Sequence, residues 1–149
     1  MTRPVLKTLL IVLALIGLSD SWYLTAMAYS GKPLVCNIAG LDGCNTVAQS
    51  AYSYLFGLPL ALYGVIFYVL VFVLVASLFF IPKRQLYRTL HAIGAVGLIA
   101  SIIFELIQIF LIKALCVYCL LSAVLSAVIF VLAWQLWKRF APPKLAVVG

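Results

Sequence analysis

Charge is what this sequence has least of. Only 9% of its 149 residues are charged and just three are acidic, whereas about 25% of an average soluble protein is charged. Hydrophobic residues make up 67% of the chain, and the mean hydropathy is +1.27. A soluble globule of this length cannot bury so much apolar surface, and a disordered or collagen-like chain would not contain it. The composition therefore predicts a membrane protein.

The few charges are mostly basic, with ten Lys and Arg and a net charge of +7. They form no contiguous stripe of the kind that binds nucleic acid, so we expect no nucleic-acid partner. They lie instead at the ends of apolar runs, where membrane proteins place them. The partners that the composition favours are therefore membrane lipids.

Four apolar runs are each long enough to cross a bilayer, which takes about 20 helical residues. A lipid-exposed backbone must satisfy its own hydrogen bonds, so these runs are expected to be helices. The sequence predicts an all-α transmembrane four-helix bundle in a single domain, residues 1–149, with an outer loop at about 30–57. The expected helices are about 5–29, 58–80, 89–112 and 116–137.

The basic residues also give the orientation, because cytoplasmic ends of membrane helices carry an excess of Lys and Arg. One side holds Lys32 and Lys113 alone. The other side holds Arg3, Lys7, Lys83, Arg84, Arg88, Lys138, Arg139 and Lys144. Both termini are therefore expected in the cytoplasm and the loop at 30–57 outside. An alternative is that the first run, ending at Ala26-Met27-Ala28, is a cleaved signal peptide, but it is long for one.

All four cysteines fall on the outer side, where disulfides form and persist. Cys36 and Cys44 lie in the outer loop, and Cys116 and Cys119 form a C-x-x-C at the start of the last helix. A helix N-terminus lowers the pKa of a cysteine and makes it nucleophilic. Static disulfides or buried thiols are the alternative. We expect no metal, since the loop spacing does not suit a zinc site and no histidine lies outside.

Such cysteines can exchange disulfides through mixed-disulfide intermediates. A loop pair could meet a soluble dithiol and a pair at the helix mouth could meet a membrane quinone, so that two electrons pass between them. Asp20, Glu105 and Gln108 are polar residues within the spans. We expect Gln108 at the depth of Cys119 and Glu105 one turn deeper, where its carboxyl could supply protons to a quinone. Hydrogen bonding between helices is the alternative role.

The outer loop is expected to contain a short half-helix that covers the bundle mouth and shields a quinone from water. Asn45 or Thr46 would cap it. The helix would run through Val47, Ser50, Ala51, Tyr54 and Leu55.

Several motifs together resemble the bacterial vitamin K epoxide reductase family. They are Cys36-x7-Cys44, Ser50, Pro59-Leu60-Ala61-Leu62-Tyr63-Gly64 and Cys116-Val117-Tyr118-Cys119. The resemblance implies a four-helix bundle that reoxidises a thioredoxin-like partner and passes electrons to a quinone, ubiquinone or menaquinone. It also implies that Cys116 and Cys119 are the redox pair beside the quinone, that Cys36 and Cys44 are the shuttle pair, and that Ser50 is the family's loop serine near the active cysteines.

The sequence departs from the family at two points. Many bacterial members carry a fused thioredoxin-like domain, so we expect a separate thioredoxin-like or DsbA-like partner here. The vertebrate enzymes bind their quinone with an Asn and a Tyr, and the corresponding residues here look like Leu60 and Ala123. We take Ser50, Glu105 and Gln108 as candidate quinone contacts instead.

These features predict a quinone-dependent, disulfide-forming oxidoreductase of a bacterial inner membrane, with its site on the periplasmic side. The rival interpretation is a scaffold or small transporter with structural disulfides. A DsbB-type oxidase is disfavoured, because that family has its C-x-x-C in the first outer loop.

Overall fold

The structure is a computed structural model that describes residues 3–36 and 43–140. Within these residues, four helices are long and apolar enough to cross a membrane, and they confirm the predicted all-α four-helix bundle. They are α1 (Arg3–Ser30), α3 (Leu60–Phe80), α4 (Arg84–Ile107), which continues into a π-helical turn, and α5 (Val117–Phe140).

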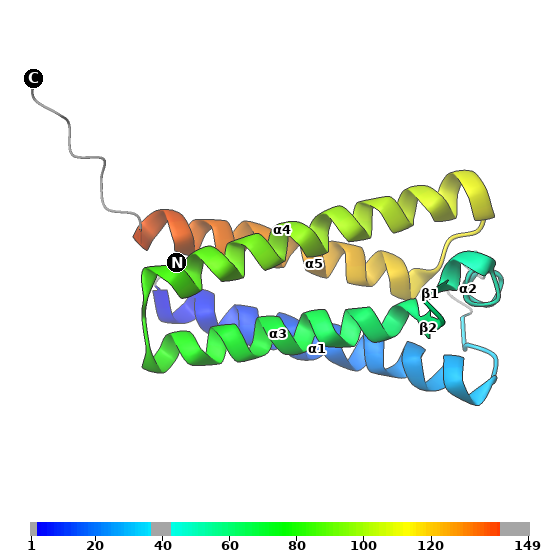
Figure 1. Ribbon diagram of the computed structural model, residues 1–149, viewed down its shortest axis with the longest axis horizontal. Helices are drawn as coiled ribbons and strands as arrows, with labels where there is room; N and C mark the ends of the chain where they lie inside the picture. Colours follow the sequence, from blue (N-terminus) through cyan, green and yellow to red (C-terminus); the bar gives the residue numbers. More distant parts are fainter. Residues whose placement is uncertain (1–2, 37–42, 141–149) are drawn as a thin grey trace, which may run out of the picture.

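The four long helices run lengthwise beside one another (Figure 1). Helix α1 packs mainly on α3, and α4 packs mainly on α5. Both described ends of the chain lie at one end of the bundle, and the short elements that follow α1 lie at the other (Figure 1). Because both described chain ends lie at the same end of the bundle, the chain runs along the bundle an even number of times. Lys144, one of the residues used to orient the chain, lies outside the described residues.

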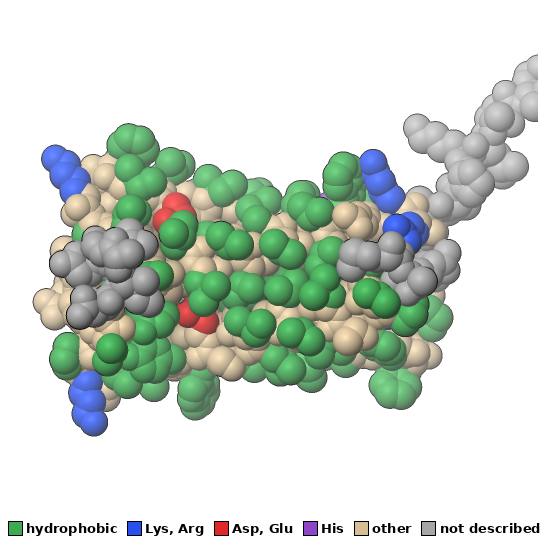
Figure 2. All heavy atoms as spheres, turned by 180° about the vertical axis from the view of Figure 1, so that it is seen from behind, with side chains coloured by type: hydrophobic (Ala, Val, Ile, Leu, Met, Phe, Trp, Pro, Cys, Tyr) green, Lys and Arg blue, Asp and Glu red, His purple; other side chains and the backbone are tan. Residues whose placement is uncertain are grey.

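Apolar side chains cover the length of the bundle, with Lys and Arg side chains towards its two ends (Figure 2). Acidic side chains are visible within this apolar belt, nearer one end (Figure 2). Exposed apolar side chains such as Val73, Val96 and Val124 lie on different helices. A surface that is apolar on every helix suits lipid and not water.

The core of the bundle contains a fully buried tyrosine, Tyr68 of α3, that packs on α1. A Cβ atom added at Gly17 of α1 would overlap the Tyr68 ring. The absence of a side chain at Gly17 therefore makes room for the Tyr68 ring between the two helices. The contact with Gly17 fixes the direction of the Tyr68 side chain. The rest of this core includes Leu6, Leu10, Ala14, Val71, Val75, Leu90, Ile129 and Leu136.

Short elements close the end of the bundle that lies opposite the two described chain ends. They are α2 (Cys44–Ala48), η1 (Ala51–Ser53), β1 (Tyr54–Leu55) and β2 (Leu58–Pro59). The strands form an antiparallel hairpin, and its turn residues Phe56 and Gly57 both have positive φ, 51° and 79°. The predicted half-helix is therefore present but ends at Ala48. Its expected continuation through Tyr54 and Leu55 is wrong, because these residues pair with Leu58 and Pro59.

The third span differs from the sequence prediction at both of its ends. Helix α4 begins at Arg84 rather than at residue 89, so Arg84 and Arg88 lie on the helix and not in a link. The same span ends in a π-helical turn, η2 (Gln108–Ile112), which the hydropathy pattern did not indicate. A π turn inserts an extra residue and rotates the side chains around it, and such turns are frequent at functional sites.

Candidate redox site

The two loop cysteines form a disulfide, and the two helix cysteines are free thiols. The Cα atoms of Cys36 and Cys44 are 6.0 Å apart. Cys44 is fully buried and belongs to one buried cluster with Leu34 and Cys116, whereas Cys36 is partly exposed at its edge. The fold thus brings the sulfurs of Cys36 and Cys44 close to that of Cys116, which is far from them in the sequence. Cys119 packs against the same cluster.

A glycine permits the approach of Cys44 to Cys116. Gly43 is the N-cap residue of helix α2, and a Cβ atom added there would lie 2.7 Å from the Leu115 carbonyl oxygen and 2.9 Å from the Ala114 Cβ. Such distances are too short for any other residue to fit without movement. The backbone before Cys44 therefore rests directly on the backbone before Cys116.

The segment before Cys36 is held by hydrogen bonds from two sides. The Asn45 side chain accepts from the Leu34 N–H (2.7 Å) and donates to the Leu34 carbonyl (3.1 Å). The expectation that Asn45 caps α2 is therefore wrong, since no side chain caps this helix and the amide pairs with a distant backbone instead. The same amide fixes the segment ahead of Cys36 to the helix that carries Cys44.

Tyr118, inside the C-x-x-C, makes the second attachment. Its hydroxyl donates to the Val35 carbonyl at 2.7 Å, and its ring lies 5.4 Å from the ring of Tyr23. The Val35 N–H in turn donates to the Tyr23 hydroxyl at 3.4 Å. Helix α5 therefore holds Val35, the residue next to Cys36, through Tyr118. This bond links the positions of the two cysteine pairs.

Cys116 occupies the capping position of helix α5. Its carbonyl accepts the Leu120 N–H at 3.0 Å, and its sulfur accepts the Cys119 N–H at 3.5 Å, where a capping oxygen would ordinarily lie. A hydrogen bond from the Cys119 thiol holds the pKa of Cys116 below its usual value. Donors at a helix N-terminus favour a thiolate, so this position favours the ionised form of Cys116.

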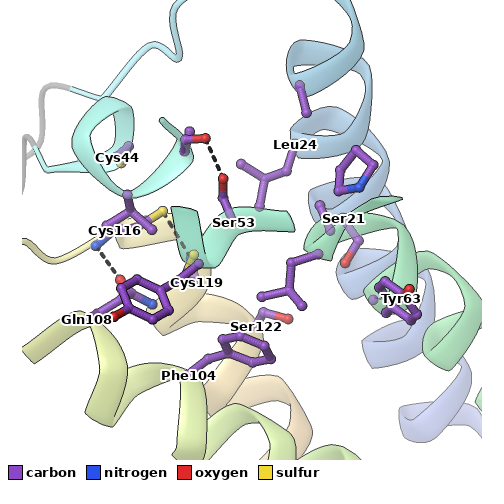
Figure 3. Close-up of a pocket in the computed structure, with 18 of the residues that line it drawn as sticks. Ser21, Leu24, Cys44, Ser53, Tyr63, Phe104, Gln108, Cys116, Cys119 and Ser122 are labelled. Atoms are coloured by element: carbon purple, nitrogen blue, oxygen red, sulfur yellow. Dashed lines mark hydrogen bonds between the residues drawn. The ribbon is translucent and has the colours of Figure 1, made fainter. Parts of the chain in front are cut away.

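Gln108 is fixed against the redox pair by η2. It is buried, and its Oε1 accepts the Cys116 N–H at 2.9 Å (Figure 3). This bond between two helices is the packing role that the sequence analysis left open. It orients the backbone of Cys116 without contacting its sulfur.

A cavity of about 680 Å³ lies beside the cysteines (Figure 3). Its wall contains six of the seven predicted site residues and lacks the partly exposed Cys36. The six are Cys44, Ser50, Glu105, Gln108, Cys116 and Cys119. Most of the remaining wall is apolar, including Leu24, Phe67 and Phe104. An apolar hollow with a few polar groups is the usual form of a site for a small organic ligand.

The polar candidates differ in what they do. The Ser50 hydroxyl donates to the Val47 carbonyl at 2.7 Å. This bond directs the hydroxyl towards its own loop. Glu105 lines the cavity, and its carboxyl forms no hydrogen bond with the described residues. Asp20 is buried with its Oδ2 atom unpaired, but it does not line the cavity. Glu105 is therefore the carboxyl that a ligand in the cavity could contact.

Some residues of the site carry no signal in the sequence. Tyr23, Tyr68 and Ser122 read as ordinary residues of apolar helices, yet Tyr23 holds the loop, and Tyr68 and Ser122 line the cavity. In the sequence, only the neighbouring C-x-x-C motif indicated that the region of Tyr118 and Ser122 belongs to a site. Their contacts depend on partners far away in the sequence, as in the bond between Tyr68 and Ser122.

Fold and site together define a membrane protein with several spans, in which a disulfide and a dithiol meet at one end beside an apolar cavity. The chain belongs to the vitamin K epoxide reductase family, whose sequence profile matches residues 8–134. It is also similar to the protein named thiol-disulfide oxidoreductase LTO1 of Arabidopsis thaliana, with 34% identity over 121 residues. That match covers 76% of this chain and 32% of the relative, so the chain spans about a third of its length.

The contact between the pairs predicts a specific cross-link. A Cys36→Ser/Cys119→Ser variant keeps only Cys44 and Cys116, which share one buried cluster. Mild oxidation should join them rapidly, as measured by peptide mapping. Adding Gly43→Ala should slow the cross-link, because the new methyl group pushes against the Leu115 backbone. The reciprocal variant, Cys44→Ser/Cys116→Ser, is the control and should cross-link poorly. Equal rates in all three would contradict the proposed contact.

The capping geometry predicts a dependence on pH. In a background with Ser at positions 36 and 44, we expect Cys119→Ala to raise the pKa of Cys116 relative to Cys119→Ser. The hydroxyl of Ser can still donate to the thiolate, whereas the methyl group of Ala cannot, and loss of a donor destabilises the charged form. The pH profile of Cys116 alkylation should therefore move upward in the Ala variant. Coincident profiles would show that residue 119 does not stabilise the thiolate.

Proposed function

We propose that this chain is a membrane thiol–disulfide oxidoreductase that reoxidises a thioredoxin-like or DsbA-like dithiol protein and passes the electrons to a quinone, ubiquinone or menaquinone. The observation that carries the proposal is the burial of Cys44 against Cys116 while Cys36 stays partly exposed. The family membership and the name of the Arabidopsis relative support the thiol–disulfide chemistry.

In the first half-reaction, a partner thiolate attacks the Cys36 sulfur and Cys44 leaves as a thiolate. The second partner thiol then attacks the mixed disulfide, so the partner leaves oxidised and Cys36 and Cys44 are reduced. Cys36 is the site of attack because Cys44 is fully buried. Two electrons and two protons enter the chain in this step.

In the second half-reaction, the Cys44 thiolate attacks Cys116 of an oxidised Cys116–Cys119 pair, and Cys119 leaves. Cys36 then attacks Cys44, which restores the Cys36–Cys44 disulfide and releases Cys116. This state, with the loop pair oxidised and the helix pair reduced, is the one in the structure. It follows transfer between the pairs and precedes transfer to the acceptor.

The cavity suits a quinone as the acceptor. Its wall is mostly apolar, it lies among membrane-spanning helices, and it includes the sulfur-bearing residue Cys119. A quinone accepts two electrons and two protons, which is what the dithiol releases when its disulfide re-forms. Glu105, in the same wall, is placed to carry a proton to it.

We further propose that the cysteines face the periplasm of a bacterial cell, with both termini in the cytoplasm. The excess of basic residues at the opposite end of the bundle supports this orientation. After reduction, a membrane-impermeant thiol reagent should label Cys36 in intact spheroplasts. A cysteine introduced at Arg84 in a cysteine-free variant is the matched control and should be labelled only after lysis. The reverse pattern would overturn the orientation.

The shuttle role is tested with a partner that has a single cysteine, activated as a mixed disulfide with a small aromatic thiol. In a Cys44→Ala variant, Cys36 should capture this partner as a lasting adduct, because the Cys44 thiol that would expel it is gone. In a Cys36→Ala variant, the buried Cys44 should form little adduct. Non-reducing electrophoresis measures both. If the loop disulfide is only structural, both variants lose folded protein alike and neither forms an adduct.

A further inference from the structure

The cavity continues from the cysteines into the bundle along helix α5. Its wall includes Cys119, Ser122 and Ser126, spaced three and four residues apart and so on one helix face. Ser122 lies about 4.5 Å further along the helix axis than Cys119. Figure 3 shows Cys119 and Ser122 in the same cavity wall as Phe104. Polar groups thus continue inward from the sulfur that is proposed to deliver the electrons.

Tyr68 of α3 faces this polar row from the opposite helix pair. It lines the cavity, it is fully buried, and its hydroxyl lies 2.8 Å from the Ser122 Oγ and 3.1 Å from the Ser122 carbonyl oxygen. The packing of its ring on Gly17 prevents the side chain from turning away. A phenol is therefore held inside the membrane, one turn deeper than Cys119.

The other polar groups of the wall are less suited to bind a ligand. The Gln108 Oε1 is occupied by the Cys116 N–H. The hydroxyls of Ser50 and Ser53 donate to carbonyls of the outer loop. Leu60, also in the wall, has no hydrogen-bonding side chain. Tyr68 and the α5 serines, which line the cavity beyond Cys119, are therefore better placed than these groups to donate to a ligand's carbonyl oxygen.

Tyr68 can turn its proton into the cavity at little cost. The Ser122 carbonyl lies within helix α5, where backbone carbonyls already accept helical N–H groups, so it does not need the Tyr68 proton. The Ser122 hydroxyl can meanwhile donate to the Tyr68 oxygen, because either atom of this pair can be the donor. The phenol would remain anchored while its O–H donates to a ligand.

We propose that the Tyr68 hydroxyl donates a hydrogen bond to a carbonyl oxygen of the quinone that Cys119 reduces, and that Ser122 positions this hydroxyl. The assignment rests on the proposed function. The Cys116 and Cys119 sulfurs join in a disulfide, and the electron pair and the two thiol protons pass to the quinone, which leaves as hydroquinone. Tyr68 is unchanged overall. Its hydrogen bond stabilises the negative charge that develops on the carbonyl oxygen as the electrons arrive.

The test is a Tyr68→Phe variant of the full chain, which removes one oxygen and keeps the ring. We expect the kcat for reduction of a short-chain ubiquinone or menaquinone analogue to fall about 100-fold, as when one donor to a developing oxyanion is removed. A single turnover in which the Cys36–Cys44 disulfide oxidises a dithiol protein should keep its rate. Tyr87→Phe is the matched control, because Tyr87 is also buried but lies in α4 away from the cavity, and it should keep both rates.

A second pair of variants separates positioning from packing. Ser122→Ala should lower the kcat less than Tyr68→Phe does, and Ser122→Thr, which keeps the hydroxyl, should restore it. Full quinone reduction by folded Tyr68→Phe protein would overturn the role of Tyr68 but not the proposed function. Equal kcat values for Ser122→Ala and Ser122→Thr would overturn the positioning by Ser122. Failure of the wild-type chain to reduce any quinone would overturn the proposed function and this inference together.

Discussion

The direct contact between the chain before Cys44 and the chain before Cys116 determines the rest of the site. Disulfide exchange needs one sulfur to reach another, and these two are separated by two membrane-spanning helices in the sequence. Gly43 allows the two backbones to touch, and the buried cluster of Leu34, Cys44 and Cys116 excludes water from the contact. The bonds from Asn45 and Tyr118 then hold Cys36 at the outer edge of the same cluster.

The bilayer explains where this irregular structure can occur. A backbone exposed to lipid must stay helical, whereas unusual turns are tolerated where protein or water surrounds them. The π turn η2 forms the last residues of its span, and the left-handed residue Lys113 and the α2 segment lie beyond the ends of the spans. There, η2 directs Gln108 to the Cys116 N–H. The long helices supply the walls of the cavity, and their ends supply the special geometry.

The sequence was sufficient for features that depend on composition and local spacing. Four apolar runs predicted the four spans, and the C-x-x-C predicted two cysteines at the start of a helix. It was insufficient where a distant partner decides. Asn45 suits a helix cap, but Leu34 offers it two hydrogen bonds. Arg84 and Arg88 resemble loop residues, yet α4 includes them. In the sequence, Tyr68 looks like one more aromatic residue of the core, because its hydrogen-bond partner Ser122 lies far away along the chain.

The order of the sulfurs along the bundle gives the proposed relay its direction. Cys36 is partly exposed, Cys44 is fully buried, Cys116 caps helix α5, and Cys119 lies within the membrane span. Each exchange would move the electrons inward by one sulfur. Because a soluble partner reaches only the first of these and a lipid-soluble acceptor only the last, the depth of each cysteine would keep the two substrates apart.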